Sequence, residues 1–380
     1  MLQTINDHAA ECHAGLEEPA PDHDPGSAMT ILPIARYRFT ARVQQPLTLP
    51  DYAGSLLRGQ FGAALRNVAC MTRQPTCPGC PLTQTCPYTR IFEAPPPPKG
   101  SHALQDFSSI PNPYIIEPPM PGARVLDANN DFEFHMVLIG HAIDQLALIV
   151  FALQRALSQG LTRQRVPTDL LQVDWLDEHG TAHPIWHMER PTLRAHTPTL
   201  SLPAKPLLTL KTIATHACNT TATGQKNQNI LNKPGHPHKP GISLLIQTPL
   251  RLQSQGKPLG IGQITPRALI ATLARRTALL MEFHANQPSW GEAARRITHL
   301  SETLTDSQAL HWFDWTRYSS RQQQEMTLGG VLGSWTLYGN LDVLAEIYPW
   351  LWLGQWLHVG KNASMGLGGY KLAPESQQAG

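Results

Sequence analysis

The feature that most constrains the fold of this chain is an order of expected elements that occurs twice. Residues 31–43 alternate apolar and polar side chains, as a half-buried strand does, and residues 52–68 carry apolar side chains at helical spacing. In both halves of the chain the order is strand, helix, strand, strand, helix, strand, which is the split βαβ arrangement. We therefore predict an α+β protein built from two tandem ferredoxin-like domains, also described as RRM-like or βαββαβ domains.

The other expected elements complete this order in each half. In the first half we expect strands at 113–117, 132–139 and 169–177, a helix at 141–159, and a hairpin partner strand at 182–187. In the second half we expect strands at 242–252, 311–323, 326–338 and 366–372, with helices at 266–285, 290–304 and 341–357. Thr265 stands directly before one of these helices and is a candidate N-cap.

Composition suggests where the domains begin and end. Residues 1–28 are acidic and rich in alanine and proline, so we expect a disordered N-terminal extension. The N-terminal ferredoxin-like domain then spans 29–190, with a cysteine-containing insert at 70–86, and a linker follows at 191–206. The C-terminal ferredoxin-like domain spans 207–380, with a flexible polar loop at 217–241 and a glycine-rich loop at 358–369.

Charge is sparse in this sequence. Only 15% of the residues are charged, against about 25% in typical soluble domains, and the formal net charge is +2. Any nucleic-acid site must therefore be a local basic patch, because the chain as a whole is nearly neutral. No apolar run reaches the ~20 residues that span a bilayer, and residues 1–28 lack a leader pattern. We expect a cytoplasmic protein without a membrane partner.

The glycine-rich segment HVGKNASMGLGGYKL, residues 358–372, is the sharpest motif. Glycines allow a backbone to approach a ligand closely, and exposed N–H groups beside a lysine can bind phosphate oxygens. A Walker A loop is excluded, because Lys361 precedes the later glycines. A dinucleotide loop is also excluded, because a helix precedes this segment and a strand follows it. The alternative interpretation is a turn whose glycines only let chain segments cross.

A second candidate surface lies along the expected strand at 311–323. Trp315, Arg317, Ser319 and Arg321 share one face of such a strand. Aromatic rings can stack on bases and arginines can pair with phosphates, although a solvated sheet face is the commoner fate of such a run. Together with the loop, the RNA-binding candidates are Gly360, Ser364, Gly366, Gly368, Gly369, Arg317, Tyr318, Ser319, Arg321 and Arg275.

Four of the six cysteines lie within a short segment after the first helix. Cys70, Cys77, Cys80 and Cys86 stand there, and two residues separate the central pair, as in zinc knuckles. In a reducing compartment such a cluster favours a metal over disulfides. We expect a structural zinc ion without a catalytic role. Free thiols and an iron–sulfur cluster are the alternatives.

Several of these segments resemble one known family. The segments at 57–66, 317–341 and 357–372, in this order, resemble the CRISPR precursor-RNA processing endoribonucleases of the RAMP superfamily, as does 247–252 ahead of the helix that carries Arg275. The resemblance implies two ferredoxin-like domains that bind the repeat of the CRISPR transcript. It also implies cleavage without a metal ion, retention of the product, and a possible place in a CRISPR effector complex.

Cleavage without a metal ion is chemically reasonable, because RNA supplies its own nucleophile, the 2′-hydroxyl. An enzyme has to align this group, remove its proton and protonate the leaving 5′ oxygen, which gives a 2′,3′-cyclic phosphate and a 5′-OH end. The resembled enzymes place a histidine near the first helix, where this chain has Ala63. Our catalytic candidates are His358, Lys361, Arg58 and Tyr52, and His135 and His141 are weaker candidates. His358 could instead be a packed histidine that caps a helix C-terminus.

Two other functions remain open at this stage. The missing histidine at the first helix is compatible with a non-catalytic subunit that holds guide RNA in a complex. A zinc-containing adaptor, whose cysteine module recruits another protein, is the alternative from a different class.

Overall fold

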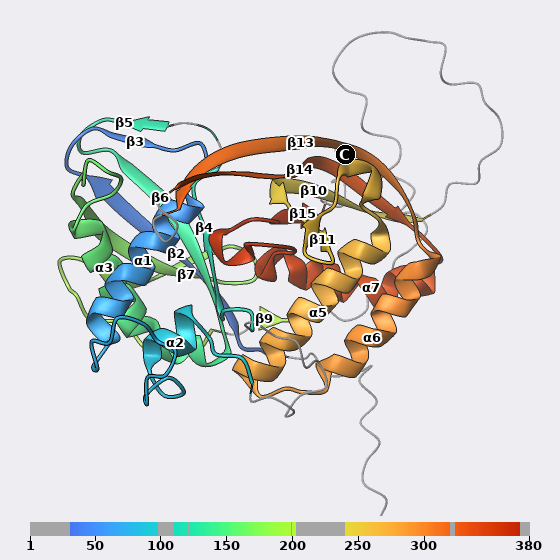
Figure 1. The fold of residues 1–380 in the computed structure, drawn as a ribbon, viewed down its shortest axis with the longest axis horizontal. Coiled ribbons are helices and arrows are strands. Elements are labelled where there is room, and N and C mark those ends of the chain that lie inside the picture. Colours follow the sequence, from blue (N-terminus) through green and yellow to red (C-terminus); the bar gives the residue numbers. More distant parts are fainter. Residues whose placement is uncertain are drawn as a thin grey trace, which may run out of the picture.

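The computed structural model of this chain describes residues 31–97, 110–120, 122, 124–198, 200–202, 240–319 and 324–372. The expected extension at 1–28 and the polar loop at 217–239 lie outside these ranges. The two halves of the chain form two domains side by side, with the N-terminal domain on the left of Figure 1. Within the described ranges, no helix combines the length and the apolar character that a bilayer span requires.

The N-terminal domain is built on a five-stranded sheet in which neighbouring strands are antiparallel. Its order, β4-β6-β2-β7-β8, places the first long strand between the third and fourth, as a ferredoxin-like fold does. The strands are β2 (Ile34–Val43), β4 (Tyr114–Glu117), β6 (Asp131–Ile139), β7 (Thr168–Leu176) and β8 (Ala182–His187).

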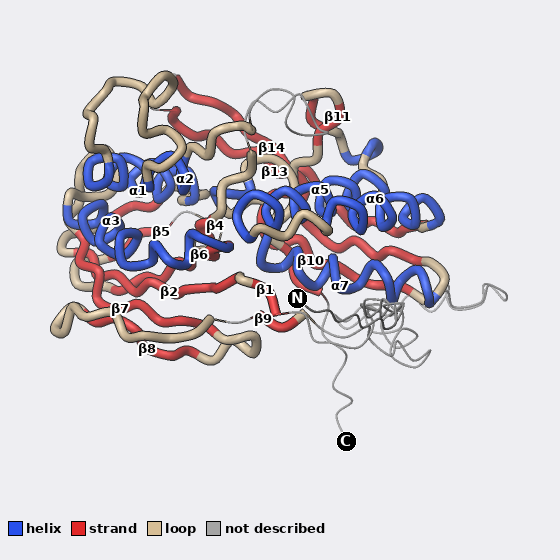
Figure 2. The backbone as a smooth tube through the Cα atoms, turned by 90° about the horizontal axis from the view of Figure 1, so that it is seen from below, coloured by secondary structure: helices blue, strands red, loops and turns tan. Residues whose placement is uncertain are grey.

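Helices cover one face of this sheet (Figure 2). They are α1 (Gly54–Ala69) and α3 (Leu146–Ser158), with the short α2 (Pro87–Phe92) beside α1. The alternation of β2 explains the arrangement, because Tyr37 and Phe39 are fully buried against the helices. Arg36 and Arg38 on the same strand point to the opposite face, which the helices of this domain leave uncovered. This open face is where polar side chains of the N-terminal domain gather.

The C-terminal domain repeats the same strand order. Its sheet runs β13-β14-β10-β15, so that the first strand again lies between the third and fourth. The elements are β10 (Gly241–Leu250), α5 (Pro266–Ala285), α6 (Trp290–Leu300), β13 (Thr305–Ser319), β14 (Gln324–Tyr338), α7 (Leu341–Leu357) and β15 (Tyr370–Leu372). The prediction of a tandem ferredoxin-like α+β fold is therefore confirmed. Thr265 is the N-cap of α5, since its side chain accepts from the Ala268 N–H.

Some boundaries differ from the predictions. The last strand was expected over 366–372 but begins at Tyr370, and a short 3₁₀ turn, Ala363–Met365, precedes it. The helix expected over 290–304 ends at Leu300, and β13 begins six residues before the expected 311. Part of the expected linker forms β9 (Leu200–Ser201), which pairs with β1 (Ile31–Leu32). Two further small sheets join β3 (Leu47–Leu49) to β5 (Arg124–Leu126) and β11 (Gln253–Ser254) to β12 (Lys257–Pro258).

The two domains share a buried apolar interface. Ile34 and Val137 of the N-terminal sheet pack with Leu280 of α5 and with Leu353 and Trp356 of α7. The long β13–β14 ribbon also crosses from the C-terminal domain towards α1 (Figure 1), where Trp315 packs against Tyr52 with ring centroids 5.5 Å apart. The domains are therefore packed as one unit, and groups from both can form one site.

Candidate functional site

The glycine-rich loop lies where the two domains meet. Gly366 and Gly368 have positive φ angles of 86° and 71°, which favour glycine. A Cβ atom at Gly366 would contact the carbonyl oxygen of Ile116 in β4, and one at Gly368 would overlap the carbonyl oxygen of Val359. These glycines therefore allow the loop to pass close to neighbouring backbone, as the alternative interpretation of the motif expects.

Most N–H groups that we expected to meet phosphate are already bonded within the protein. The Gly366 N–H donates to the Ala363 carbonyl at 2.8 Å, and the Gly368 N–H donates to the Pro249 carbonyl at 3.1 Å. The Gly369 N–H donates to the Thr248 hydroxyl at 2.7 Å, and this hydroxyl donates in turn to the Gly366 carbonyl. A phosphate would have to displace these bonds, so the loop's phosphate contacts remain a prediction without geometric support.

The outer part of the loop is more accessible. The Lys361 side chain is exposed, while Gly360 and Ser364 are half-buried. The Lys361 N–H donates to the Arg251 carbonyl at 2.9 Å, which fixes the loop and leaves the ammonium group to solvent. Lys361 is thus placed to meet an RNA phosphate, although it does not line the cleft described below.

Two of the catalytic candidates lie in or just before α1, and protein groups hold both of them. Tyr52 is buried, and its hydroxyl donates to the Met365 carbonyl at 2.7 Å. Burial, with a smaller contribution from the charge of Glu117, raises the pKa of Tyr52 well above its ordinary value. The Arg58 guanidinium stacks on the ring of Phe92, 4.3 Å from its centroid, towards α2 and away from the loop. Their roles in this geometry are packing roles.

His358 lies at the centre of the domain interface. It follows α7 as the C-cap residue and is 4% exposed. Its Nδ1 lies 3.2 Å from the Leu367 carbonyl, and its Nε2 lies 3.1 Å from Glu117 Oε1. A base must offer a free lone pair to a proton, and both His358 nitrogens are engaged. This geometry matches the alternative interpretation, a packed histidine at a helix C-terminus.

Glu117 connects this histidine to the N-terminal sheet. Arg36 of β2 donates to Glu117 Oε1 at 2.8 Å and also to the Gln355 carbonyl of α7 at 2.8 Å. Burial raises the pKa of Glu117, whereas the Arg36 guanidinium and the His358 imidazole lower it. The lowering is larger, so the pKa of Glu117 falls far below its usual range. Glu117 is therefore an anion held between Arg36 of the N-terminal domain and His358 of the C-terminal domain.

A cleft of about 760 Å³ opens next to this network, between the open face of the N-terminal sheet and the glycine-rich region. Arg36, Glu117 and His135 line it from the N-terminal domain, while Thr248 and Lys371 line it from the C-terminal domain. The cleft has the size of a small-molecule or nucleotide site. Sequence patterns gave His135 only a weak signal and missed Glu117 and Lys371, because the pairing of β4 with β6 and the packing of the two domains bring them together.

His135 is the histidine of this cleft that can take part in chemistry. It lies on β6 directly opposite Glu117 on β4 and is half-buried. Burial lowers the pKa of His135, and the nearby Arg36 adds to this effect while Glu117 opposes it. His135 is therefore neutral at neutral pH and can accept a proton. Lys371 of β15 lines the same cleft. Burial and the nearby Arg36 lower the pKa of Lys371.

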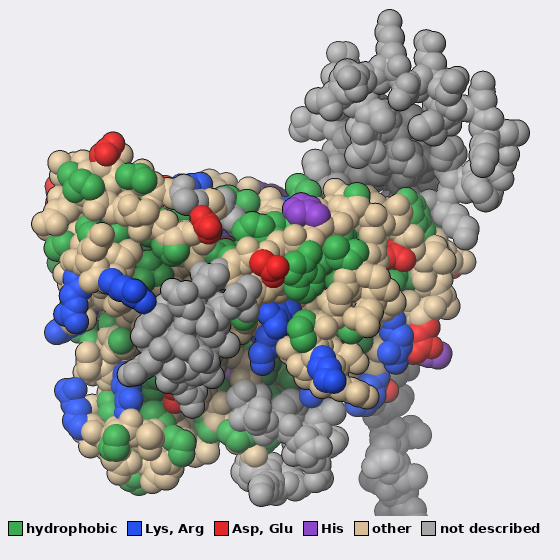
Figure 3. Space-filling view, turned by 45° about the horizontal axis from the view of Figure 1, so that its top comes forward, with side chains coloured by type: hydrophobic (Ala, Val, Ile, Leu, Met, Phe, Trp, Pro, Cys, Tyr) green, Lys and Arg blue, Asp and Glu red, His purple; other side chains and the backbone are tan. Residues whose placement is uncertain are grey.

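Charge in and around the cleft is mixed. Besides Arg36 and Lys371, the lining contains the cation Arg124 and the carboxylates of Asp131 and Glu133. On the face shown in Figure 3, basic side chains form separate spots among uncharged and apolar ones, with no continuous basic stripe. The molecule thus offers local contacts for phosphates, as the net charge of +2 suggests.

The remaining RNA-binding candidates lie elsewhere. The backbone of residues 317–319 forms the far end of β13, paired with residues 324–326 of β14. The side chains of Arg317, Tyr318 and Ser319, and all of Arg321, lie outside the part that the structure describes. Arg275 is exposed on α5 and does not line the cleft.

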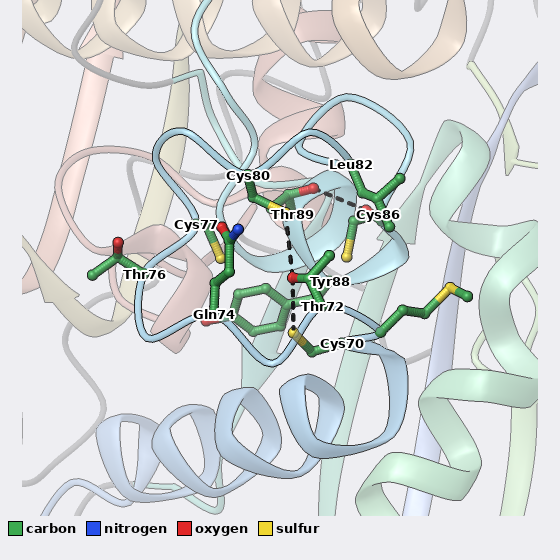
Figure 4. Close-up of a pocket in the computed structure, with 11 residues that line it drawn as sticks. Cys70, Thr72, Gln74, Thr76, Cys77, Cys80, Leu82, Cys86, Tyr88 and Thr89 are labelled. Atoms are coloured by element: carbon green, nitrogen blue, oxygen red, sulfur yellow. Dashed lines mark hydrogen bonds between the residues drawn. The ribbon is translucent and has the colours of Figure 1, made fainter.

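The four clustered cysteines do lie close together. Cys70, Cys77, Cys80 and Cys86 line one hollow beside α1 and α2 (Figure 4). All four are free thiols, and among the described residues no three histidine, cysteine or acidic side chains stand ready-arranged around a metal position. The expected zinc ion therefore stays a prediction.

Comparisons with known proteins show what this molecule is similar to. Residues 32–198 match a family model described as an N-terminal domain, and residues 244–370 match the model of the CRISPR-associated endoribonuclease Cas6. The second match agrees with the resemblance to CRISPR RNA-processing endoribonucleases that the sequence motifs indicate. The matched residues 244–370 lie in the C-terminal ferredoxin-like domain, which is joined to an N-terminal domain of the same fold.

A solved structure with a TM-score above 0.5 supports the fold, and two further structures show a weaker similarity. A Cas6 product complex is 14% identical with a TM-score of 0.51, covering 90% of this chain and 99% of that chain. The structure of Thermus thermophilus Cas6 is 14% identical with a TM-score of 0.45, covering 91% of this chain and 100% of that one. A RAMP protein described as binding different RNA substrates is 10% identical with a TM-score of 0.40, covering 90% and 100%. No curated protein sequence matches this chain.

Proposed function

We propose that this protein matures CRISPR RNA by binding the repeat of the precursor transcript and cleaving it without a catalytic metal ion. The observation that carries the proposal is the match of residues 244–370 to the Cas6 model, in a domain packed against a second ferredoxin-like domain. RNA recognition and cleavage by the 2′-hydroxyl are the finer parts of the proposal, and the interdomain cleft supports them.

In this proposal the repeat crosses the cleft with its phosphates near Lys371 and Arg124. His135, neutral at neutral pH, accepts the proton of the 2′-hydroxyl as that oxygen attacks the adjacent phosphate. Lys371 stabilises the charge that develops on the phosphate and donates a proton to the leaving 5′ oxygen. The products are a 2′,3′-cyclic phosphate and a 5′-OH end. His358 ranks below His135 as the base, because its nitrogens already bond to Leu367 and Glu117.

The test is incubation of the purified protein with repeat RNA in excess chelator. We expect cleavage at one position, and we expect a single 2′-deoxy substitution before that position to abolish it. His135→Ala should slow cleavage at least about a hundredfold with little change in binding, as expected for a general base. His183→Ala, which changes an exposed histidine on β8, is the matched control and should cleave normally. A requirement for divalent ions, or cleavage of the deoxy substrate, would refute the proposed chemistry.

A non-catalytic RNA-binding subunit is the second candidate. It is favoured by the position of Tyr52 and Arg58, which are held by protein groups near the start of α1, where this chain has no histidine. Such a subunit would bind repeat RNA tightly and leave it intact, alone or within a CRISPR effector complex. Binding without cutting, for both native protein and His135→Ala, would decide for this function.

A further inference from the structure

The insert at residues 70–86 is held in shape mainly by hydrogen bonds, such as those from the Thr83 hydroxyl to the Cys77 and Cys80 carbonyls. None of its residues is buried, and none belongs to a helix or a strand. It connects α1 to α2 through turns, such as the one in which the Cys80 N–H donates to the Cys77 carbonyl at 3.0 Å. A segment this short cannot build an apolar core, and small segments of this kind are usually cross-linked by disulfides or metal ions.

Its four cysteines face a common space. Figure 4 shows the sulfur atoms of Cys70, Cys77, Cys80 and Cys86 arranged around the hollow that they line, while the Thr72 side chain reaches in between them. The Thr72 hydroxyl lies 3.4 Å from the Cys80 sulfur and 4.0 Å from the Cys70 sulfur. A polar group thus already bridges two of the thiols across the space where an ion would sit.

The size of the hollow limits what can occupy it. It has room for about 20 Å³, which corresponds to roughly one water-sized particle. A single ion fits this space, whereas an iron–sulfur cluster contains several iron and sulfide atoms. Four thiolates around one small ion form the usual closed, tetrahedral zinc site.

The local charges also suit thiolate ligands. The Arg66 guanidinium donates to the carbonyls of Gln74 and Pro75, which holds it beside the insert. Its positive charge would offset part of the net negative charge of a zinc ion bound by four thiolates.

We propose that Cys70, Cys77, Cys80 and Cys86 bind one structural zinc ion that holds the insert together. Binding draws the four sulfur atoms inward and removes the Thr72 hydroxyl from between Cys70 and Cys80. The site plays no part in cleavage, so this proposal stands or falls independently of the RNA chemistry.

Metal analysis of the full-length protein, purified from zinc-supplemented medium, is the first test. We expect one zinc per chain, and we expect the visible absorption of a tetrahedral thiolate site after replacement by Co²⁺. We also expect chelation to make the chain sensitive to protease within residues 70–86, with the rest staying protected. A chain without zinc that also shows no thiolate spectrum with Co²⁺ would overturn the proposal, as would iron with inorganic sulfide.

Two variants separate coordination from packing. Cys80→Ser removes a ligand and should weaken zinc binding by more than about tenfold, since changes outside the ligand shell alone cost that much. Thr72→Val removes the competing hydroxyl at nearly constant volume and should bind zinc as tightly as the native protein or more tightly. If Cys80→Ser and the native protein bind zinc equally, the cysteines are not the ligands. Should Cys80→Ser fail to fold, the Co²⁺ spectrum of the native protein still decides.

Discussion

The hydrogen bonds of each histidine determine which one can accept a proton during a reaction. His358 stands beside the most recognisable motif, yet it is enclosed by a carbonyl and a carboxylate. Its partner Glu117 lies 241 residues away in the chain, so no local sequence pattern predicts that the two side chains are in contact. His135 gave a weaker signal, but the pairing of β6 with β4 places it in the cleft beside that network.

The Arg36–Glu117–His358 network should contribute to stability through the charge of Glu117. Glu117→Gln leaves the Arg36 guanidinium facing a neutral amide, and we expect a loss of about 3 kcal/mol in the free energy of unfolding. Glu133→Gln is the matched control, because Glu133 is exposed and pairs loosely with Arg38 at 3.7 Å. Its change should stay within about 0.5 kcal/mol. Denaturant unfolding measures the free energy of unfolding of both variants. Equal losses would show that the Arg36–Glu117–His358 network contributes no more to stability than the exposed Glu133 pair does.

Lys371 should contact an RNA phosphate. Lys371→Ala is expected to weaken repeat binding and to reduce the slope of log affinity against log salt by about one, the value for one lost phosphate contact. Lys257→Ala, at an exposed lysine in β12 outside the cleft, should leave both unchanged. Lys361→Ala tests the outer loop in the same titration. An unchanged slope for Lys371→Ala together with a reduced slope for Lys361→Ala would move the phosphate path from the cleft to the loop.

Elements with a strong periodic pattern were predictable from the sequence. β2 and α1 each bury one face, so their apolar residues recur at strand spacing in β2 and at helical spacing in α1. This spacing can be seen in the sequence. The start of β13 was missed because Thr305–Leu310 is largely polar, and its strand form depends on pairing with β14. The last strand proved short because the N–H groups of the glycines before Tyr370 bond to the Ala363 carbonyl, the Pro249 carbonyl and the Thr248 hydroxyl, outside the regular ladder of β15 with β10.

The glycine-rich loop should tolerate side chains poorly even where it meets no ligand. Gly368→Ala forces a residue with positive φ against the Val359 carbonyl, and we expect it to cost at least about 2 kcal/mol of stability. Gly59→Ala is the matched control, because Gly59 is exposed within α1 and a Cβ there meets no atom within 4 Å. That change should stabilise by about 0.5–1 kcal/mol. Thermal unfolding compares the two, and a Gly368→Ala protein as stable as native would refute the packing role.

At the scale of the whole molecule, the domain interface carries a pair of histidines, of which His284 is buried and His141 is half-buried. His284 of α5 bonds to the Pro111 carbonyl at 2.7 Å, and its ring lies 5.0 Å from that of His141. Burial lowers the pKa of His284 to about 4, and His141, Arg276 and Arg90 also disfavour its protonated form. Burial and Arg90 likewise lower the pKa of His141, while Asp144 opposes them.

Stability should therefore depend on pH between about 6.5 and about 4. In this window the unfolded His284 binds a proton and the folded one does not, so stability falls as pH falls, by up to about 1.4 kcal/mol per unit for this group. His284→Gln should flatten the dependence, because glutamine keeps a donor for Pro111 without titrating. His183→Gln, at an exposed histidine, should not change it. Urea unfolding at several pH values decides, and parallel curves for His284→Gln and native protein would contradict the assignment.

Cross-linking can show directly which residues of the protein lie next to the scissile phosphate of the RNA. Repeat RNA carrying 4-thiouridine next to the scissile phosphate can be cross-linked to the native protein in chelator. We predict cross-links to the two walls of the cleft, in residues 131–139 of β6 and in residues 369–372 around β15. Cross-links confined to the helical face of α1 and α3, with none in these segments, would contradict the claim that RNA is held and cut between the domains.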